Sequence, residues 1–293
     1  MMKSQAVAYK YALSAIFLWS TVATAFKIAL EYLTPLELVL YASISSMIVL
    51  FIVIWYQRKL SEVKKHFRSN FTIILILGGL NPFLYYLVLF KAYELLPAQE
   101  AQSINYTWAL MLAFFSVVFL KQRLTVKDII AGIICYFGVL IIATKGTPFA
   151  LNFSNLEGVG YALLSTILWS MYWILNTKLK SDPIVGLFSN FLISIPLIFI
   201  YFIFTQPLQA PSFEGILAAI YVGFFEMGIT FVFWLKAMQS ATSTSKIANL
   251  IFISPFISLI FIYFIVGEEI SFSTIIGLCA IVFGLFIQQY RRQ

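Results

Sequence analysis

Charged residues are scarce in this sequence. Lysine, arginine, aspartate and glutamate make up 11% of its 293 residues, whereas soluble domains carry about 25%. A water-exposed surface on a chain of this length needs more charge, but lipid tolerates exposed apolar side chains. The shortage excludes an ordinary soluble globule and predicts that the chain lies in a membrane.

Cysteine and histidine are also rare. Cys135 and Cys279 each lie inside an apolar stretch, and the only histidine, His66, lies in a basic segment. A disulfide framework or a cysteine metal site needs more cysteines at closer spacing, and no nucleotide-binding loop is present. We therefore expect no metal site, no cofactor and no ATP-driven pump.

What the sequence does contain is ten apolar segments. A helix that crosses a bilayer needs about 20 predominantly apolar residues. The segments are continuous rather than alternating, so they predict helices and not the strands of a barrel. The expected fold is all-α and polytopic, with spans at Tyr11–Leu30, Leu36–Tyr56, Phe71–Leu95, Ala98–Leu120, Asp128–Thr144, Gly158–Thr177, Val185–Phe204, Phe213–Lys236, Ser243–Val266 and Phe272–Gln289.

The basic residues fall almost entirely on one side of the predicted membrane. If the N-terminus is cytoplasmic and the chain crosses ten times, only Lys145 among the loop lysines and arginines lies outside. This bias predicts that both termini are cytoplasmic. Lys27 and Lys91 lie near the outer ends of spans, where lysine extends to the lipid headgroups. Positive charge scattered over short loops also excludes a nucleic-acid-binding face.

The sequence repeats itself at an offset of about 150 residues. Trp19-Ser20 recurs as Trp169-Ser170. Five spans per half is an odd number, so the second half crosses the membrane in the opposite sense, which is a recurrent plan of secondary transporters. We expect one five-helix repeat over residues 1–146, a second over residues 147–293, and transport by alternating access.

Glu226 is the acidic residue that lies near the middle of a predicted span. A charge at that depth costs about 2.5–3.5 kcal/mol on insertion scales and is functional by default. We interpret Glu226 as a proton carrier or as a counter-charge for an ammonium group on the substrate. The alternative is a neutral, hydrogen-bonded structural glutamate.

The repeat pairs Glu226 with Asn81, which precedes Pro82. Proline in the middle of a span removes a backbone hydrogen bond, and Gly78 and Gly79 loosen the helix further. Helices broken at corresponding positions of two halves indicate where a transporter binds its substrate. We therefore expect the site at the seam between the halves.

Pro255 breaks the ninth span in the same way. Other polar and aromatic side chains lie at comparable depth, and we predict that they bind the substrate together with Glu226 and Asn81, although the tryptophans are equally suited to helix packing. These residues are Tyr85, Asn105, Tyr106, Asn249, Trp19, Trp169 and Trp173.

These features resemble the drug/metabolite transporter superfamily in its ten-helix EamA-type form. The residues that carry the resemblance are Leu18-Trp19-Ser20 with Lys27, Leu168-Trp169-Ser170, Ser254-Pro255, Gly267-Glu268-Glu269-Ile270 and the glycine-spaced fifth and tenth spans.

Within the superfamily, Asn105-Tyr106-Thr107-Trp108 resembles a stretch of the branch that includes aromatic amino acid exporters, and it adds Trp108 to the predicted site. Ala109 stands where that branch has proline. Lys121-Gln122-Arg123-Leu124 replaces the usual Gly-Glu-Arg-Leu of the first half. These departures concern the substrate rather than the fold.

The resemblance implies a central cavity lined by spans one to four and six to nine, with spans five and ten at the side. It also implies an inner-membrane location and export or exchange of a small metabolite. Our first hypothesis is an amino acid or related zwitterion. The alternatives are proton-coupled export of organic cations and a non-transporting membrane scaffold, and the protein is expected to act as a monomer or homodimer. An enzyme is not expected, because Glu226 has no second acidic residue or histidine at its level.

Overall fold

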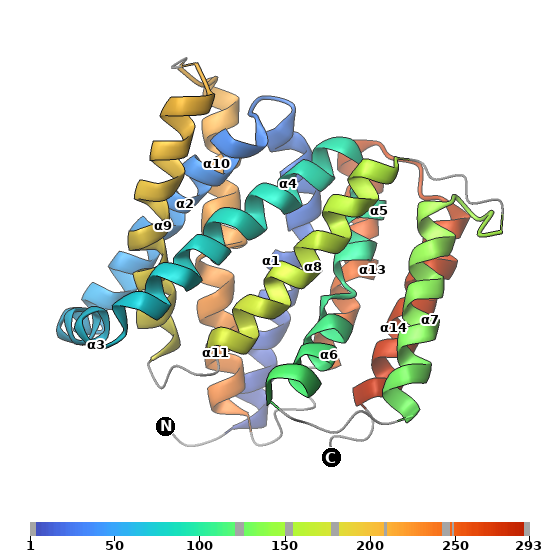
Figure 1. Ribbon diagram of the computed structural model, residues 1–293, viewed down its shortest axis with the longest axis horizontal. Coiled ribbons are helices and arrows are strands. Elements are labelled where there is room, and N and C mark those ends of the chain that lie inside the picture. Colours follow the sequence, from blue (N-terminus) through green and yellow to red (C-terminus); the bar gives the residue numbers. More distant parts are fainter. Residues whose placement is uncertain are drawn as a thin grey trace.

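The computed structural model describes residues 4–120, 126–149, 155–176, 182–207, 210–241, 247 and 249–289. Over these residues the chain is helical apart from short connections, without a strand. The helices form one bundle, and α1 begins at the same end of it as α14 finishes (Figure 1). The elements in chain order are α1 (Gln5–Leu30), α2 (Pro35–Tyr56), α3 (Leu60–Gly78), η1 (Gly79–Leu84), α4 (Tyr85–Leu95), α5 (Ala98–Asn105), α6 (Trp108–Leu120), α7 (Val126–Ala143), α8 (Leu156–Asn176), α9 (Pro183–Thr205), α10 (Phe213–Phe225), α11 (Ile229–Ser240), η2 (Asn249–Ile253), α13 (Ser254–Phe261), η3 (Ile262–Val266) and α14 (Phe272–Gln289).

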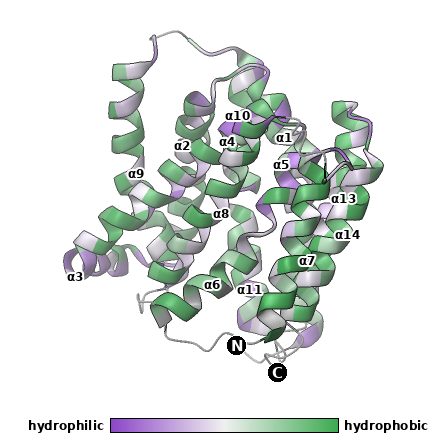
Figure 2. Ribbon diagram, turned by 45° about the vertical axis from the view of Figure 1, so that its right-hand side comes forward, coloured by the Kyte–Doolittle hydropathy of each residue, from purple (hydrophilic) through white to green (hydrophobic). Residues whose placement is uncertain are grey.

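The surface of the bundle is suited to lipid. In the described part of the chain, seven helices are long and apolar enough to cross a membrane, and three shorter apolar helices accompany them. Large apolar side chains such as Phe17, Ile52 and Phe264 are exposed, and hydrophobic residues cover most of the helices (Figure 2). The protein is therefore a multi-pass membrane protein.

Helix boundaries follow local sequence signals. The hydroxyl of Thr34 accepts a hydrogen bond from the Glu37 N–H at 3.3 Å, and the Glu37 carboxylate accepts one from the Thr34 N–H at 2.7 Å. Pro35 takes the first position of α2, where its missing N–H costs nothing. Thr34-Pro35 thus ends one apolar segment and starts the next.

Two membrane-crossing helices are broken at points related by the repeat. Helix α3 gives way to the π-helical segment η1, in which Asn81 has extended backbone and the Asn81–Pro82 peptide bond is cis. Helix α10 ends at Phe225 and α11 begins at Ile229, with Glu226 at the break. The Thr230 hydroxyl donates to the Phe225 carbonyl that the break leaves free.

The helices of the first half pack largely on those of the second. Helix α3 contacts α9 as α10 contacts α2, and α4 contacts α8 as α11 contacts α1. Likewise α6 contacts α8 as α13 contacts α1. Each of these contacts has a repeat-related counterpart, so the two sets of helices interlock rather than stand apart.

Glycine permits two of these helix pairs to approach closely. A Cβ atom on Gly78 would lie 2.7 Å from the carbonyl oxygen of Asn190, and one on Gly223 would lie 2.3 Å from that of Ala42. Gly223 is the repeat counterpart of Gly78. Small residues at helix crossings in membranes let backbones meet in this way.

Helices α7 and α14 pack on each other at one side of the bundle (Figure 1). A Cβ on Gly138 would lie 2.6 Å from the carbonyl oxygen of Gly277, and one on Gly284 would lie 2.9 Å from that of Ala131. The glycine spacing noted in the sequence therefore serves this contact, and it leaves the other helices to form the centre.

The segment Leu60–Ser69 differs from the sequence prediction, which placed it in a loop. It is the first part of α3, and the helix bends at Asn70, where φ is −136° and ψ is 23°. Val63 and Phe67 on one face of the segment pack into the core. Their spacing of four residues is the helical signal that the charge of this segment obscured.

Two charged side chains from other helices and loops, Lys27 and Glu268, cap the helix ends on either side of the turn between α4 and α5. The Lys27 ammonium group donates to the carbonyls of Tyr93 at 2.9 Å and Leu96 at 3.0 Å, at the end of α4. The Glu268 carboxylate accepts from the first two N–H groups of α5, at 2.9 and 3.4 Å. Each charge lies at the helix end whose dipole it complements. Lys27, expected to extend to the headgroups, instead caps a helix.

Glu268→Ala is expected to lower the free energy of unfolding by about 1 kcal/mol, because α5 loses its N-terminal acceptor. The measurement is the apparent melting temperature in detergent. Glu269→Ala is the matched control, since the neighbouring side chain is exposed and the change should be neutral. Equal losses from both variants would contradict a specific capping role.

Candidate functional site

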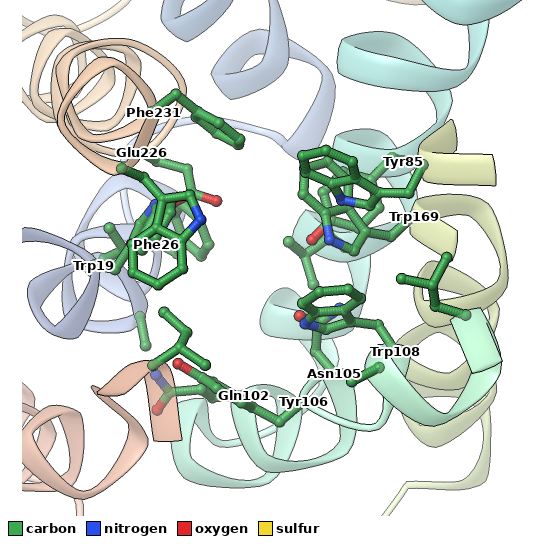
Figure 3. A pocket seen from close by; sticks show the side chains of 18 of the residues that line it. Trp19, Phe26, Tyr85, Gln102, Asn105, Tyr106, Trp108, Trp169, Glu226 and Phe231 are labelled. Atoms are coloured by element: carbon green, nitrogen blue, oxygen red, sulfur yellow. The ribbon is translucent and has the colours of Figure 1, made fainter. Parts of the chain in front are cut away.

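A cavity of about 370 Å³ lies between α1, α4, α5, α6, α8, α11 and η2. This volume is within the range of small-molecule sites, roughly 300–1,000 Å³. Figure 3 looks into the cavity. Its polar and aromatic lining consists of Trp19, Phe26, Tyr85, Tyr93, Gln102, Asn105, Tyr106, Trp108, Trp169, Trp173, Glu226, Phe231, Trp234 and Phe252.

Glu226 enters the cavity wall from the break between α10 and α11. Its carboxylate accepts a hydrogen bond from the Tyr86 hydroxyl at 3.1 Å, and Trp19 lines the same cavity. Among the described lining residues it is the one charged side chain, and no lysine, arginine or histidine is among them. The described lining therefore carries one acidic group and no basic group.

Five of the six tryptophans of the chain line this cavity. Trp169 stacks on Tyr85, with ring centroids 4.5 Å apart and an interplanar angle of 25°. Trp19 contacts Phe231 and Trp234 edge-on or tilted, at centroid distances of 5.6 and 5.5 Å. Trp19 and Trp169, which are related by the repeat, stand on opposite walls (Figure 3).

Amide and hydroxyl groups come from α5 and the turn that follows it. The Asn105 amide donates to the Ser165 hydroxyl at 2.8 Å, and Tyr106, in the turn, lines the cavity beside it. Gln102 precedes Asn105 by one helical turn and lines the same cavity. These groups supply neutral hydrogen-bonding partners beside Trp108 and away from Glu226 (Figure 3).

The serines of the repeated Leu-Trp-Ser motif do not line the cavity but form hydrogen bonds between the helices that surround it. Ser20 is fully buried and shares a hydrogen bond of 3.1 Å with Ser254 of α13. Ser170 is also buried and donates to the carbonyl of Trp108 at 2.8 Å. Each serine ties the helix that carries a cavity tryptophan to a helix of the other half.

Most of the residues predicted from the sequence to bind the substrate lie around this one cavity. They are Glu226, Tyr85, Asn105, Tyr106, Trp108, Trp19, Trp169 and Trp173. Their binding role remains a prediction.

Two predicted residues do not belong to the described lining. Asn81 is 2% exposed, and its side-chain oxygen has no hydrogen-bond partner among the described residues. It lies in η1, which packs on α9 and α8, where its backbone is extended. Asn81 therefore does not share the cavity lining with Glu226 in this structure, and its role in binding stays a prediction. The side chain of Asn249 lies outside the described residues.

The four predicted helix-breaking residues flank the cavity instead of lining it. Gly78 and Gly79 stand at the junction of α3 and η1, with Pro82 inside η1. Pro255 is near the start of α13, directly after the 3₁₀ helix η2. The breaks shape the elements that carry the lining residues.

Several residues in or next to the cavity were not predicted from the sequence. Gln102 could have been found, since it lies three residues before Asn105 on the same helix face. Trp234 is likewise three residues after Phe231, and both face Trp19. Tyr86 carried no signal, because nothing in a single sequence indicates that its hydroxyl would reach Glu226.

The family model described as the EamA-like transporter family matches residues 6–144 and again residues 156–288. The chain is similar to an uncharacterized transporter of Clostridium kluyveri, with 24% identity over 59% of this chain and 57% of that protein. It is similar to the uncharacterized transporter YoaV of Bacillus subtilis, with 22% identity over 95% of each chain.

A further relative is an aromatic amino acid exporter, YddG, of Ancylobacter novellus. That protein is 24% identical over 56% of each chain, so the match spans little more than half of its length. One solved structure superposes with a TM-score of 0.68 at 20% identity and covers 97% of both chains. The structural likeness extends the fold over almost the entire sequence.

Proposed function

This chain belongs to the EamA-like transporter family, and on that premise we propose that it is a secondary carrier for small organic cations with an aromatic or apolar body. The observation that supports this substrate class is the cavity: one carboxylate, five tryptophans and no basic group among the described lining residues.

A cavity lined by a carboxylate and tryptophans, without a basic group among the described residues, favours a cationic substrate. A carboxylate in a low-dielectric site gains most from an opposite charge that enters with the substrate. Tryptophan faces attract ammonium groups as well, by about 2 kcal/mol or more when water is excluded. The negative charge of Glu226 would repel an anionic substrate, and the described lining residues include no basic side chain to offset that repulsion.

The transport cycle is alternating access by two inverted halves. The seven long apolar helices and the three shorter ones make ten spans in this proposal, with both termini cytoplasmic and the protein in the inner membrane. Interlocked, repeat-related contacts allow each half to adopt the arrangement of the other. The cavity at their seam would then open to either side in turn. Glu226 can hold a proton in one state and the cation in the other, which couples the fluxes by exchange.

An aromatic amino acid is the second candidate. Two observations favour it: the relative named as an aromatic amino acid exporter, and the stretch Asn105-Tyr106-Thr107-Trp108. In this case Glu226 would receive the ammonium group, and the amides of Gln102 and Asn105 would receive the carboxylate. The two candidates differ only in whether the substrate carries a carboxylate.

Matched pairs of ligands separate them. We expect phenethylamine and tyramine to raise the apparent melting temperature of the purified protein more than phenylalanine and tyrosine do, because the amines lack the group that Glu226 repels. At about 100 times its Kd, a ligand adds about 2.7 kcal/mol of stability. A thermal-shift measurement at equal concentrations reads the difference.

Each other outcome has a definite meaning. Stabilisation by the amino acids alone would replace the cation proposal with the second candidate. No stabilisation by any amine, amino acid or nucleobase would favour a non-transporting scaffold.

A further inference from the structure

The first part of α3 is a two-faced helix. Val63, His66, Phe67 and Asn70 follow the spacing i, i+3, i+4, i+7, and all four are buried or half-buried. This face packs toward the protein, since Val63 and Phe67 belong to the hydrophobic core. The segment is therefore held in a fixed orientation before the helix bends at Asn70.

The opposite face is basic and exposed. Lys64, Lys65 and Arg68 lie within one turn of each other, and each side chain is exposed. Arg58, at the turn just before the helix, is exposed as well, whereas Lys59 is paired with Asp182 at 2.6 Å. Figure 2 shows the start of α3 as a hydrophilic segment at the edge of the hydrophobic bundle.

Aromatic side chains adjoin this basic face. Trp55 is 66% exposed and Tyr56 is 86% exposed, at the end of α2 where the chain turns into α3. Trp55 is also the one tryptophan that does not line the cavity. Tryptophan and tyrosine favour the level of the headgroups in a bilayer.

The repeat does not require this helix. The corresponding connection in the second half, residues 206–212, contains no basic residue, and its described residues are not helical. The basic helix is thus an addition to one half, at the connection that the charge bias places on the cytoplasmic side. A helix with one buried face, a basic exposed face and flanking aromatic residues is the arrangement that binds anionic bilayer surfaces.

We propose that Lys64, Lys65, Arg68 and Arg58 form a binding site for the phosphate headgroups of anionic phospholipids, with Trp55 and Tyr56 anchored at the top of the acyl chains. The occupant follows from charge complementarity and from depth, since only a lipid headgroup presents a phosphate beside a membrane-exposed tryptophan. The proposal is independent of the substrate.

The fluorescence of Trp55 reports which lipid lies beside the basic helix. The protein is reconstituted into phosphatidylcholine vesicles that contain a minority of phosphatidylglycerol, with one or the other lipid brominated near the head of its acyl chains. The Trp55 signal is the fluorescence of the wild type minus that of Trp55→Phe. We expect brominated phosphatidylglycerol to quench this signal well beyond its mole fraction, and the excess to fall as salt is raised.

A charge-matched pair of variants tests the site. Lys64→Gln with Lys65→Gln should reduce the excess quenching at least about fivefold, since each basic residue near an anionic surface contributes roughly fivefold. Lys10→Gln with Lys145→Gln removes the same charge from two other exposed positions and should leave the excess unchanged. Quenching by phosphatidylglycerol in proportion to its mole fraction in the wild type, or an equal loss in both double variants, would overturn the proposal. A drop confined to the first double variant, with its melting temperature retained, would support it.

Discussion

Glu226→Gln is expected to weaken the binding of a small aromatic amine by roughly thirtyfold. A hydrogen bond to a charged group is worth about 1.5–3 kcal/mol, and about 2 kcal/mol corresponds to that factor in Kd. Glutamine keeps an oxygen that can accept from the Tyr86 hydroxyl, so the local packing should survive while the charge is lost. Titration calorimetry on purified protein measures the change directly.

The control lies on the same helix. Glu214, in the first turn of α10, is exposed, so Glu214→Gln alters the net charge equally without entering the cavity. Its Kd should equal that of the wild type. Similar Kd values for Glu226→Gln and the wild type would show that the charge of Glu226 does not contribute to binding.

Glu226→Gln also tests whether amine transport is coupled to proton transport. In proteoliposomes with an imposed pH gradient, amine flux through the wild type should follow the gradient. Flux through Glu226→Gln should be small and should ignore it, because glutamine cannot exchange a proton for the cation. Wild-type flux that ignores the gradient would remove proton exchange from the proposal and leave the cation site intact.

The parts of the structure that the sequence could predict are those set by apolar length and by repetition. A run of about 20 apolar residues leaves the backbone little choice in lipid, so the helical bundle followed from composition. The repeated Leu-Trp-Ser motif placed Trp19 and Trp169 in equivalent positions, and they face each other across the cavity. The mid-span proline likewise indicated a break, and α3 is broken there.

The direction of a side chain at a break could not be predicted. Sequence offset equates Asn81 with Glu226, but offset carries no information on backbone angles. Asn81 has extended backbone inside a π-helical segment, whereas Glu226 has helical angles at the end of α10. One side chain therefore enters the helix packing and the other enters the cavity wall.

The helical start of α3 was not predicted because its sequence is rich in charged residues. Basic residues between two apolar runs were interpreted as a loop, and charge count alone gives no reason for another interpretation. The helix over Leu60–Ser69 becomes visible only when apolar spacing is considered apart from charge, since Val63 and Phe67 are one turn apart. Positive charge in this sequence thus indicates both the expected sidedness and the helix that we propose binds lipid headgroups.

Gly223→Ala is expected to cause a large loss of stability from the addition of a single methyl group. The new Cβ would lie 2.3 Å from the carbonyl oxygen of Ala42 and 2.7 Å from the Cβ of Ser45. Backbone atoms cannot rotate out of the way as the end of a long side chain can, so α10 and α2 must separate. Overpacking of this kind costs about 1–3 kcal/mol, which the apparent melting temperature in detergent measures.

Gly160→Ala provides the matched substitution. Nothing lies within 4 Å of a Cβ at Gly160, and alanine favours a helix over glycine by up to about 1 kcal/mol, so this variant should be as stable as the wild type or more stable. Gly78→Ala, at the repeat-related contact with Asn190, should resemble Gly223→Ala. A stable Gly223→Ala, or an equal loss from Gly160→Ala, would contradict the close helix crossing. Losses of stability in both Gly78→Ala and Gly223→Ala, with Gly160→Ala unaffected, would show that the two repeat-related helix crossings depend on glycine in the same way.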